Sequence, residues 1–84
     1  MAAKPYFTPD AARRYYERLG IHADLETQSD IVARIRAGEC EVLEKQDKGW
    51  TVKCALHHKH HRLIVIYDHR RKQVTTLWVN KEPL

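Results

Sequence analysis

The sequence predicts an α+β domain in which two N-terminal helices pack on one face of a four-stranded antiparallel meander, in the order ααββββ. Three observations predict this class. Apolar residues recur at helical spacing up to Gly38, they alternate with polar residues after it, and the connections in the second half are short. Short connections require neighbouring strands to run antiparallel, because a parallel pair needs a long crossover. We expect one domain over residues 1–84, with an arm at 1–7 and a tail at 80–84.

The first helix has clear start and stop signals. Thr8 is expected to cap its N-terminus, Pro9 suits the first helical position, and Asp10 complements the helix dipole. Gly20 is a suitable residue for the C-terminal end. One apolar stripe is expected to face the core, formed by Ala11, Ala12, Tyr15 and Leu19.

The second helix is expected to end at Arg36, before Gly38, but its start has competing signals. Thr27 or Ser29 could cap it, or it could begin earlier, at Asp24. Its buried stripe is expected to consist of Ile31, Val32 and Ile35.

Four strand segments follow, over residues 41–44, 50–57, 63–67 and 74–79, with turns at 47–49 and 68–72. The second segment alternates, which predicts a wet face carrying Thr51, Lys53, Ala55 and His57. Residues 63–67 are apolar on both faces and are therefore expected to form a central strand. Trp50 and Trp78 are expected in the core, because so short a chain needs its large aromatic residues for burial. Stacking on nucleic-acid bases is the alternative role.

The net charge of +4 lies entirely in the second half, where residues 41–84 hold nine basic and five acidic residues. A basic half indicates an anionic partner, usually nucleic acid, although solubility alone is the competing explanation. No run of 18 apolar residues exists, and Met1 to Pro5 lacks the apolar stretch of a signal peptide. We therefore expect a cytoplasmic protein with no membrane partner, in which Cys40 and Cys54 stay reduced.

Cys54 and the histidines between residues 57 and 61 invite two chemical interpretations. A zinc site is disfavoured, because structural zinc uses separated ligand pairs and Cys54 and His57 would point to opposite faces of a strand. We expect no metal and no cofactor. A pair of histidines can instead accept and donate protons near neutral pH, as metal-free RNA cleavage requires. The competing explanation is a solvated hairpin connection.

The connection at residues 57–61, which carries the histidines, and the turn at residues 68–72, which carries two arginines, cannot form one compact site. In a meander they lie at opposite ends of the sheet, roughly 15–17 Å apart at about 3.4 Å per residue. A phosphate backbone lying across the wet face could touch both turns.

Several stretches resemble small bacterial and phage domains related to BrnT-type toxins, over about residues 8–79. The matching stretches are Thr8-x-Asp10-Ala11-x-x-Arg14-x-x-Glu17-Arg18-x-Gly20-Ile21, Asp30-Ile31-x-x-x-Ile35-x-x-Gly38, Arg62-Leu63-Ile64-Val65-Ile66-Tyr67, and Val74-Thr75-Thr76-Leu77-Trp78-Val79. These domains are similar to the RelE-like ribonucleases, which cleave RNA without metal. Asp10 replaces the histidine with which the family helix usually opens, and the connection 21–29 is longer than usual.

The resemblance implies a small RNA-directed protein, a metal-independent endoribonuclease of toxin type whose partner would be an antitoxin. Its acid–base and phosphate-holding residues would be His60, His61, Arg62 and Tyr67. Nucleic-acid affinity would come from Lys53, Lys59, His69, Arg70, Arg71, Lys72, Arg14 and Arg18. The alternative is a non-enzymatic binding module, of a kind that phages encode, which uses the same surface to hold nucleic acid or an acidic protein.

Overall fold

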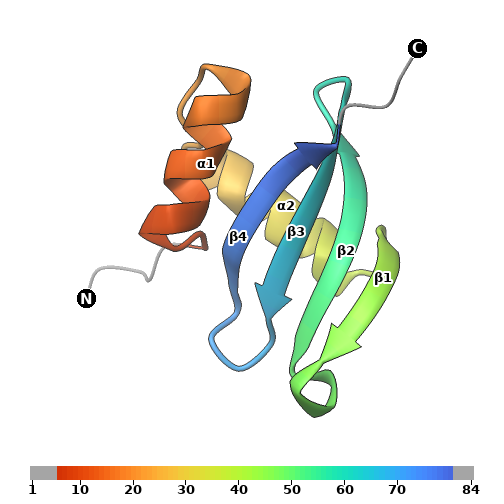
Figure 1. Ribbon diagram of the computed structural model, residues 1–84. Helices are drawn as coiled ribbons and strands as arrows, with labels where there is room; N and C mark the ends of the chain where they lie inside the picture. Colours follow the sequence, from red (N-terminus) through yellow and green to blue (C-terminus); the bar gives the residue numbers. More distant parts are fainter. Residues whose placement is uncertain (1–5, 81–84) are drawn as a thin grey trace.

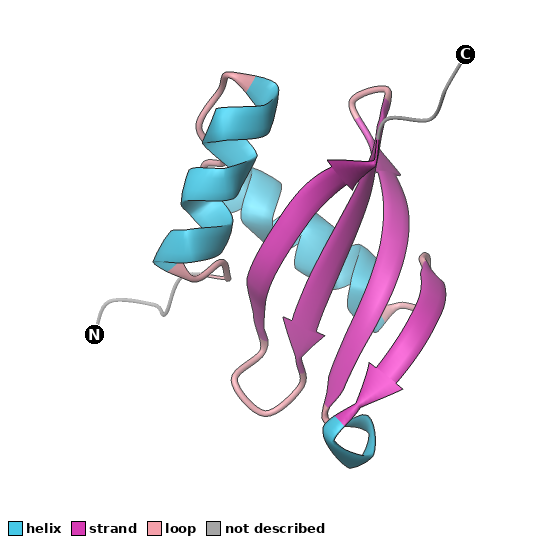
Figure 2. Cartoon of the chain, viewed as in Figure 1, coloured by secondary structure: helices cyan, strands magenta, loops and turns pink. Residues whose placement is uncertain are grey.

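The computed structural model describes residues 6–80, and its element order is the predicted one (Figures 1 and 2). Two helices, α1 (Pro9–Leu19) and α2 (Leu25–Arg36), precede the strands β1 (Glu41–Gln46), β2 (Thr51–His58), β3 (His61–Asp68) and β4 (Gln73–Asn80). A one-turn segment, η1 (Asp47–Gly49), joins β1 to β2. The strands form a single antiparallel sheet in the order β1-β2-β3-β4, so the α+β meander is confirmed.

The core lies between the helices and one face of the sheet, with α2 crossing behind the sheet and α1 running beside β4 (Figure 1). Alternate residues of the central strands supply the sheet side of this core, and the predicted stripes supply the helix side. Its members include Ala11, Tyr15, Ile31, Val32, Ile35, Val52, Cys54, Leu56, Leu63, Val65, Tyr67, Val74 and Leu77. None of the helices over residues 6–80 is long and apolar enough to cross a membrane.

The predicted ends of α1 are confirmed, and the N-terminal one also ties the helix to β4. The Thr8 hydroxyl accepts a hydrogen bond from the Ala11 amide at 3.2 Å and donates one to the Thr75 carbonyl at 2.8 Å. Phe7 is buried and forms a parallel bridge with Val74, so residues 6–8 pair with the edge of β4. Gly20 ends the helix with a φ of 75°, a left-handed conformation that glycine adopts without steric conflict.

The earliest of the three candidate caps of α2 is the observed one. Asp24 caps the helix by accepting from the Thr27 amide at 2.8 Å, so Thr27 and Ser29 lie inside the helix. Gln28 was not among the residues expected in the core, yet it is buried with both ends of its amide hydrogen-bonded. It accepts from the Phe7 amide at 3.1 Å and donates to the Ala23 carbonyl at 2.8 Å.

Three burial predictions for the sheet were wrong. Trp50 precedes β2 instead of lying in it, and the residue is 47% exposed. Ala55, expected to be wet, is buried because Ile64 pairs with it and Trp78 pairs with Ile64, which makes an apolar row across the outer face. Trp78 was expected in the core, yet it is half-buried in that row on the outer face.

Candidate nucleic-acid interface

The four residues expected to act in catalysis do not come together in one site. His60 and His61 are exposed at the β2–β3 turn. Arg62 lies on the outer face, where its guanidinium donates to the Glu41 carboxylate at 3.0 Å. Tyr67 belongs to the core on the opposite face. The pKa of its hydroxyl is raised, mainly by burial.

The β2–β3 turn creates a histidine pair that the sequence analysis missed. Lys59 and His60 are its two central residues, and both have positive φ, at 48° and 67°, as a tight type I′ hairpin requires. This turn places His58 directly opposite His61, on the helix side of the sheet with Leu56 and Leu63. The alternation from Cys54 through Leu56 was the signal that could have placed His58 on this face.

His58 is held by a buried tyrosine of α1. The Tyr15 hydroxyl lies 2.7 Å from His58 Nε2. Burial, and to a lesser degree Asp24, raise the pKa of Tyr15, so its hydroxyl keeps its proton and the hydrogen bond to the imidazole joins two protonatable groups. Burial is also the main cause that lowers the pKa of His58; Lys59 and Arg34 add to it, and Asp30 opposes it. The lowered pKa favours the neutral imidazole over the charged one.

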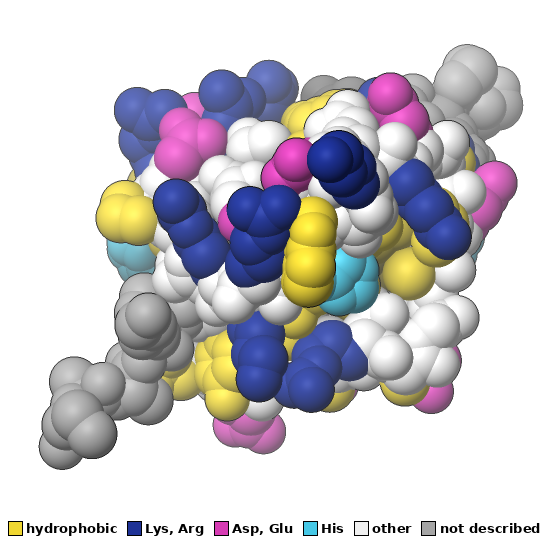
Figure 3. Space-filling model, turned by 90° about the horizontal axis from the view of Figure 1, so that it is seen from below, with side chains coloured by type: hydrophobic (Ala, Val, Ile, Leu, Met, Phe, Trp, Pro, Cys, Tyr) yellow, Lys and Arg dark blue, Asp and Glu magenta, His cyan; other side chains and the backbone are white. Residues whose placement is uncertain are grey.

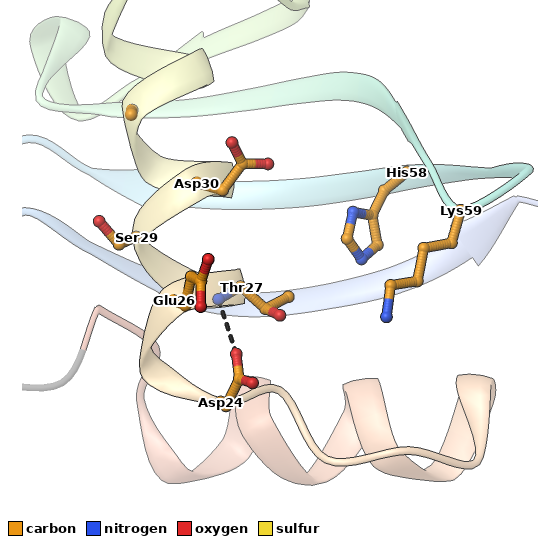
Figure 4. Close-up of a pocket in the computed structure, with 8 residues that line it drawn as sticks. Asp24, Glu26, Thr27, Ser29, Asp30, His58 and Lys59 are labelled. Atoms are coloured by element: carbon orange, nitrogen blue, oxygen red, sulfur yellow. Dashed lines mark hydrogen bonds between the residues drawn. The ribbon is translucent and has the colours of Figure 1, made fainter.

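An open groove of about 610 Å³ lies beside His58 (Figure 4). Its walls are the N-terminal half of α2 and the β2–β3 turn, with Asp24, Glu26, Thr27, Ser29, Asp30, Ala33, His58 and Lys59 lining it. Three carboxylates against one ammonium make this groove unfavourable for phosphate. Within residues 6–80 no group of three or more His, Cys, Asp or Glu side chains could hold a metal ion.

The opposite end of the sheet has a different character, and we call it the tryptophan end. It consists of residues 47–50 and the β3–β4 turn at residues 68–72, which lie at the same end of the sheet in Figure 1. Hydrogen bonds fix the backbone of Trp50 on both sides. Its amide donates to the Asp47 carbonyl at 3.0 Å, and its carbonyl accepts from the His69 amide at 2.8 Å. The backbone of Trp50 is therefore ordered, and the residue that it carries is exposed to solvent.

Arg70 lies over the indole. Its guanidinium carbon is 4.9 Å from the ring centroid of Trp50, a cation–π geometry, and its Nη2 lies 3.4 Å from Asp47 Oδ2. The turn that carries Arg70 is tied by Asp68, whose Oδ1 accepts from the amides of Arg70 at 2.8 Å and Arg71 at 3.3 Å. Trp50 and Arg70 are thus positioned by different connections that meet in space.

The backbone that presents Trp50 is strained. Asp47, Lys48 and Gly49 have φ values of 50°, 56° and 91°, three successive residues in the left-handed region. A non-glycine residue there costs roughly 1–2 kcal/mol. Such strain persists where the surroundings enforce it, and it clusters at binding and switch regions.

The two connections that meet at Trp50 carry four basic side chains. Lys48, Arg70, Arg71 and Lys72 are all exposed, against the two carboxylates of Asp47 and Asp68. Seen from below, this end of the molecule shows Lys and Arg side chains spread around a histidine and exposed apolar side chains (Figure 3). The His69 ring packs edge-on against Tyr67, with centroids 4.9 Å apart.

The other residues expected to bind nucleic acid are distributed over three surfaces. Lys53 lies on the outer face, with its ammonium 5.3 Å from the ring centroid of Trp78. Arg14 is on α1, where its Nε lies 2.9 Å from Asp10 Oδ2. Arg18 shares a depression of about 390 Å³ with Glu17, His61 and Val79, and Lys59 lines the groove beside His58. Residues His69 to Lys72 are the expected residues that lie in the turn next to Trp50, and Arg70 is the one that lies over the indole.

Comparison of the chain with protein-family models, with curated proteins and with solved structures found no match. The chain is therefore described by its architecture, a small α+β domain of two helices and a four-stranded antiparallel sheet.

Proposed function

We propose that this domain is a small RNA-binding module and that the tryptophan end is its binding surface. The observation that carries the proposal is the exposed indole of Trp50, which lies under Arg70 between two connections rich in basic residues. RNA offers both ligands that such a surface suits, phosphates for the cations and base faces for the indole.

Charge favours this end of the sheet over the other. The tryptophan end carries four basic side chains and two carboxylates, whereas three carboxylates face one lysine in the groove beside His58. A phosphate chain is attracted to the first surface and repelled from the second. If Arg70, Arg71 and Lys72 each neutralise one phosphate, the affinity for single strands should fall roughly 20-fold between about 50 and 200 mM salt.

The test is the affinity of the protein for an RNA oligonucleotide at several salt concentrations. Arg71→Gln should weaken binding and flatten the salt dependence, because one phosphate contact is lost. Arg13→Gln is the matched control, since Arg13 is similarly exposed, at 64% against 72%, but lies on α1. Equal loss in both variants would show non-specific attraction to net charge. Affinity independent of salt would refute the proposal, and tight binding to an acidic protein instead would support the acidic-partner alternative.

A second candidate is the metal-independent endoribonuclease, and the pairing of His58 with His61 favours it. Opposed residues of an antiparallel pair lie about 5 Å apart at their Cα atoms, and the lowered pKa of His58 favours a neutral imidazole beside His61. Arg18, in the depression next to His61, could hold the phosphate. This candidate is the activity that the resemblance to BrnT- and RelE-like toxins implies, and its partner protein would be an antitoxin.

The cleavage test uses total cellular RNA and tag-free protein in EDTA. Discrete products that disappear with His61→Ala would support the enzyme, and His60→Ala is the matched control from the same exposed turn. Intact RNA in a preparation that binds RNA would leave the binding module as the function.

A further inference from the structure

We infer that the tryptophan end selects single-stranded over double-stranded nucleic acid, by stacking one unpaired base on the indole of Trp50. The inference rests on the proposed function, and it names the class of ligand that this surface takes. It follows from the arrangement of the ring, its cation and its backbone.

The indole keeps exposed surface although a cation lies over it. The Arg70 guanidinium carbon is 4.9 Å from the ring centroid, and Trp50 is still 47% exposed. A base stacked on the exposed part of the ring would add to the contact between guanidinium and indole. In a duplex the base faces are already stacked on their neighbours, so only an unpaired or terminal base can reach the ring.

The platform is ordered before a ligand arrives. Backbone hydrogen bonds from Trp50 to Asp47 and from His69 to Trp50 hold the residue that carries the ring. Asp47 also pairs with the Arg70 guanidinium at 3.4 Å, and Asp68 ties the turn from which Arg70 projects. Stacking on a preformed surface loses little conformational freedom, and more of the interaction therefore appears as affinity.

Trp78 is an internal contrast. It also has a cation over its ring, Lys53 at 5.3 Å, but it is half-buried in the apolar row with Ala55 and Ile64. Two tryptophans with the same kind of cationic neighbour thus differ in exposure, and only Trp50 stands at the basic end. Stacking of this kind uses no base edge, so we expect little sequence preference.

The experiment monitors Trp50 alone, in the Trp78→Phe variant, by indole fluorescence. The ligands are a mixed-sequence RNA of about 12 nucleotides without self-complementarity, its blunt duplex with the complement, and inorganic polyphosphate. We expect the single strand to quench the fluorescence and to bind at least about 10-fold more tightly than the duplex. Polyphosphate should bind weakly and leave the fluorescence unchanged.

Substitution of the ring then separates stacking from charge. Trp50→Ala should weaken single-strand binding roughly 5- to 150-fold and leave duplex binding almost unchanged. Trp50→Phe should restore part of the loss, because a smaller aromatic face remains. Because Trp50 is exposed, its removal should leave the circular dichroism spectrum and the unfolding midpoint close to those of the unsubstituted protein.

The outcomes distinguish the two proposals. Equal affinity for single strand and duplex, or single-strand binding unaffected by Trp50→Ala, would overturn the selection while RNA binding stands. Polyphosphate binding as tightly as RNA would also overturn it, since the surface would then recognise phosphate only. No measurable binding of any RNA would overturn both.

Discussion

The hydrogen bond between Tyr15 and His58 gives the sharpest test of the packing between α1 and the sheet. Tyr15→Phe removes one oxygen atom and keeps the buried ring, including its edge-on contact with Phe7 at 6.2 Å between centroids. A hydrogen bond of this kind contributes about 0.5–1.5 kcal/mol net. His58 is only half-buried, so water can reach part of the imidazole and limit the penalty. We therefore expect the free energy of unfolding to fall by about 1 kcal/mol.

Urea unfolding followed by far-ultraviolet circular dichroism at about pH 8 measures this loss, since His58 is then neutral. For a domain of this size, 1 kcal/mol corresponds to a fall in Tm of roughly 4–8 °C. The neighbouring Tyr16→Phe is the matched control. Its hydroxyl belongs to an exposed ring that stacks on His22, so its stability should change by less than about 0.5 kcal/mol.

A double-mutant cycle with His58→Phe assigns the loss to the pair. If the hydroxyl acts through His58, Tyr15→Phe should have a much smaller effect in the His58→Phe background, with a coupling of about 1 kcal/mol. A Tyr15→Phe protein as stable as the parent, or two additive effects, would refute this account of the pair. The ring contact at 5.7 Å would then be all that joins these residues.

Three further predictions concern the helix ends and the response to pH. Thr8→Ala should lower the free energy of unfolding by about 1–2 kcal/mol in urea titrations, because both the cap to Ala11 and the bond to Thr75 are lost; a change below about 0.3 kcal/mol would contradict this. Gly20→Ala should lower it by about 1 kcal/mol through the φ of 75° alone, since an added Cβ meets nothing within 4 Å; an unchanged midpoint would show that the helix end relaxes freely. Because folding lowers the pKa of His58, chiefly by burial, the unfolded chain takes up a proton more readily, and stability should fall as pH drops below about 6.5. Unfolding measured between about pH 5.5 and 7.5 should show this slope, and it should lessen in His58→Phe; an equal slope in that variant would assign it to other groups.

Short-range physics determined most of the secondary structure from the sequence alone. Helix α1 begins after Thr8 and ends before Gly20, as predicted. A side-chain cap and a left-handed residue act within a few residues of the helix end, so the local sequence is enough to predict them. The change of apolar period after Gly38 likewise marked the start of the sheet. The start of α2 needed more information, since three candidate caps lay within six residues and their local signals do not rank them.

Part of the candidate site could be predicted from the sequence. The basic turn at residues 68–72 and the base-stacking alternative for Trp50 came from the sequence. The exposure of Trp50 did not, because alternation places a side chain only while the chain remains a strand, and here residues 47–49 leave it with positive φ. Tyr67 was expected to act on RNA, yet its place in the register puts it in the core.

The tertiary structure alone decided which distant residues meet. Tyr15 and His58 are 43 residues apart in the chain, and Trp50 meets Arg70 only because two separate connections lie at the same end of the sheet. Composition and periodicity are local properties, so they predicted helices, strands and a basic half. Contact between distant side chains depends on strand register, on the bulge between Val42 and Glu44, and on the packing of α1 beside β4. These features result from burying the whole core at once, and a window of neighbouring residues does not contain them.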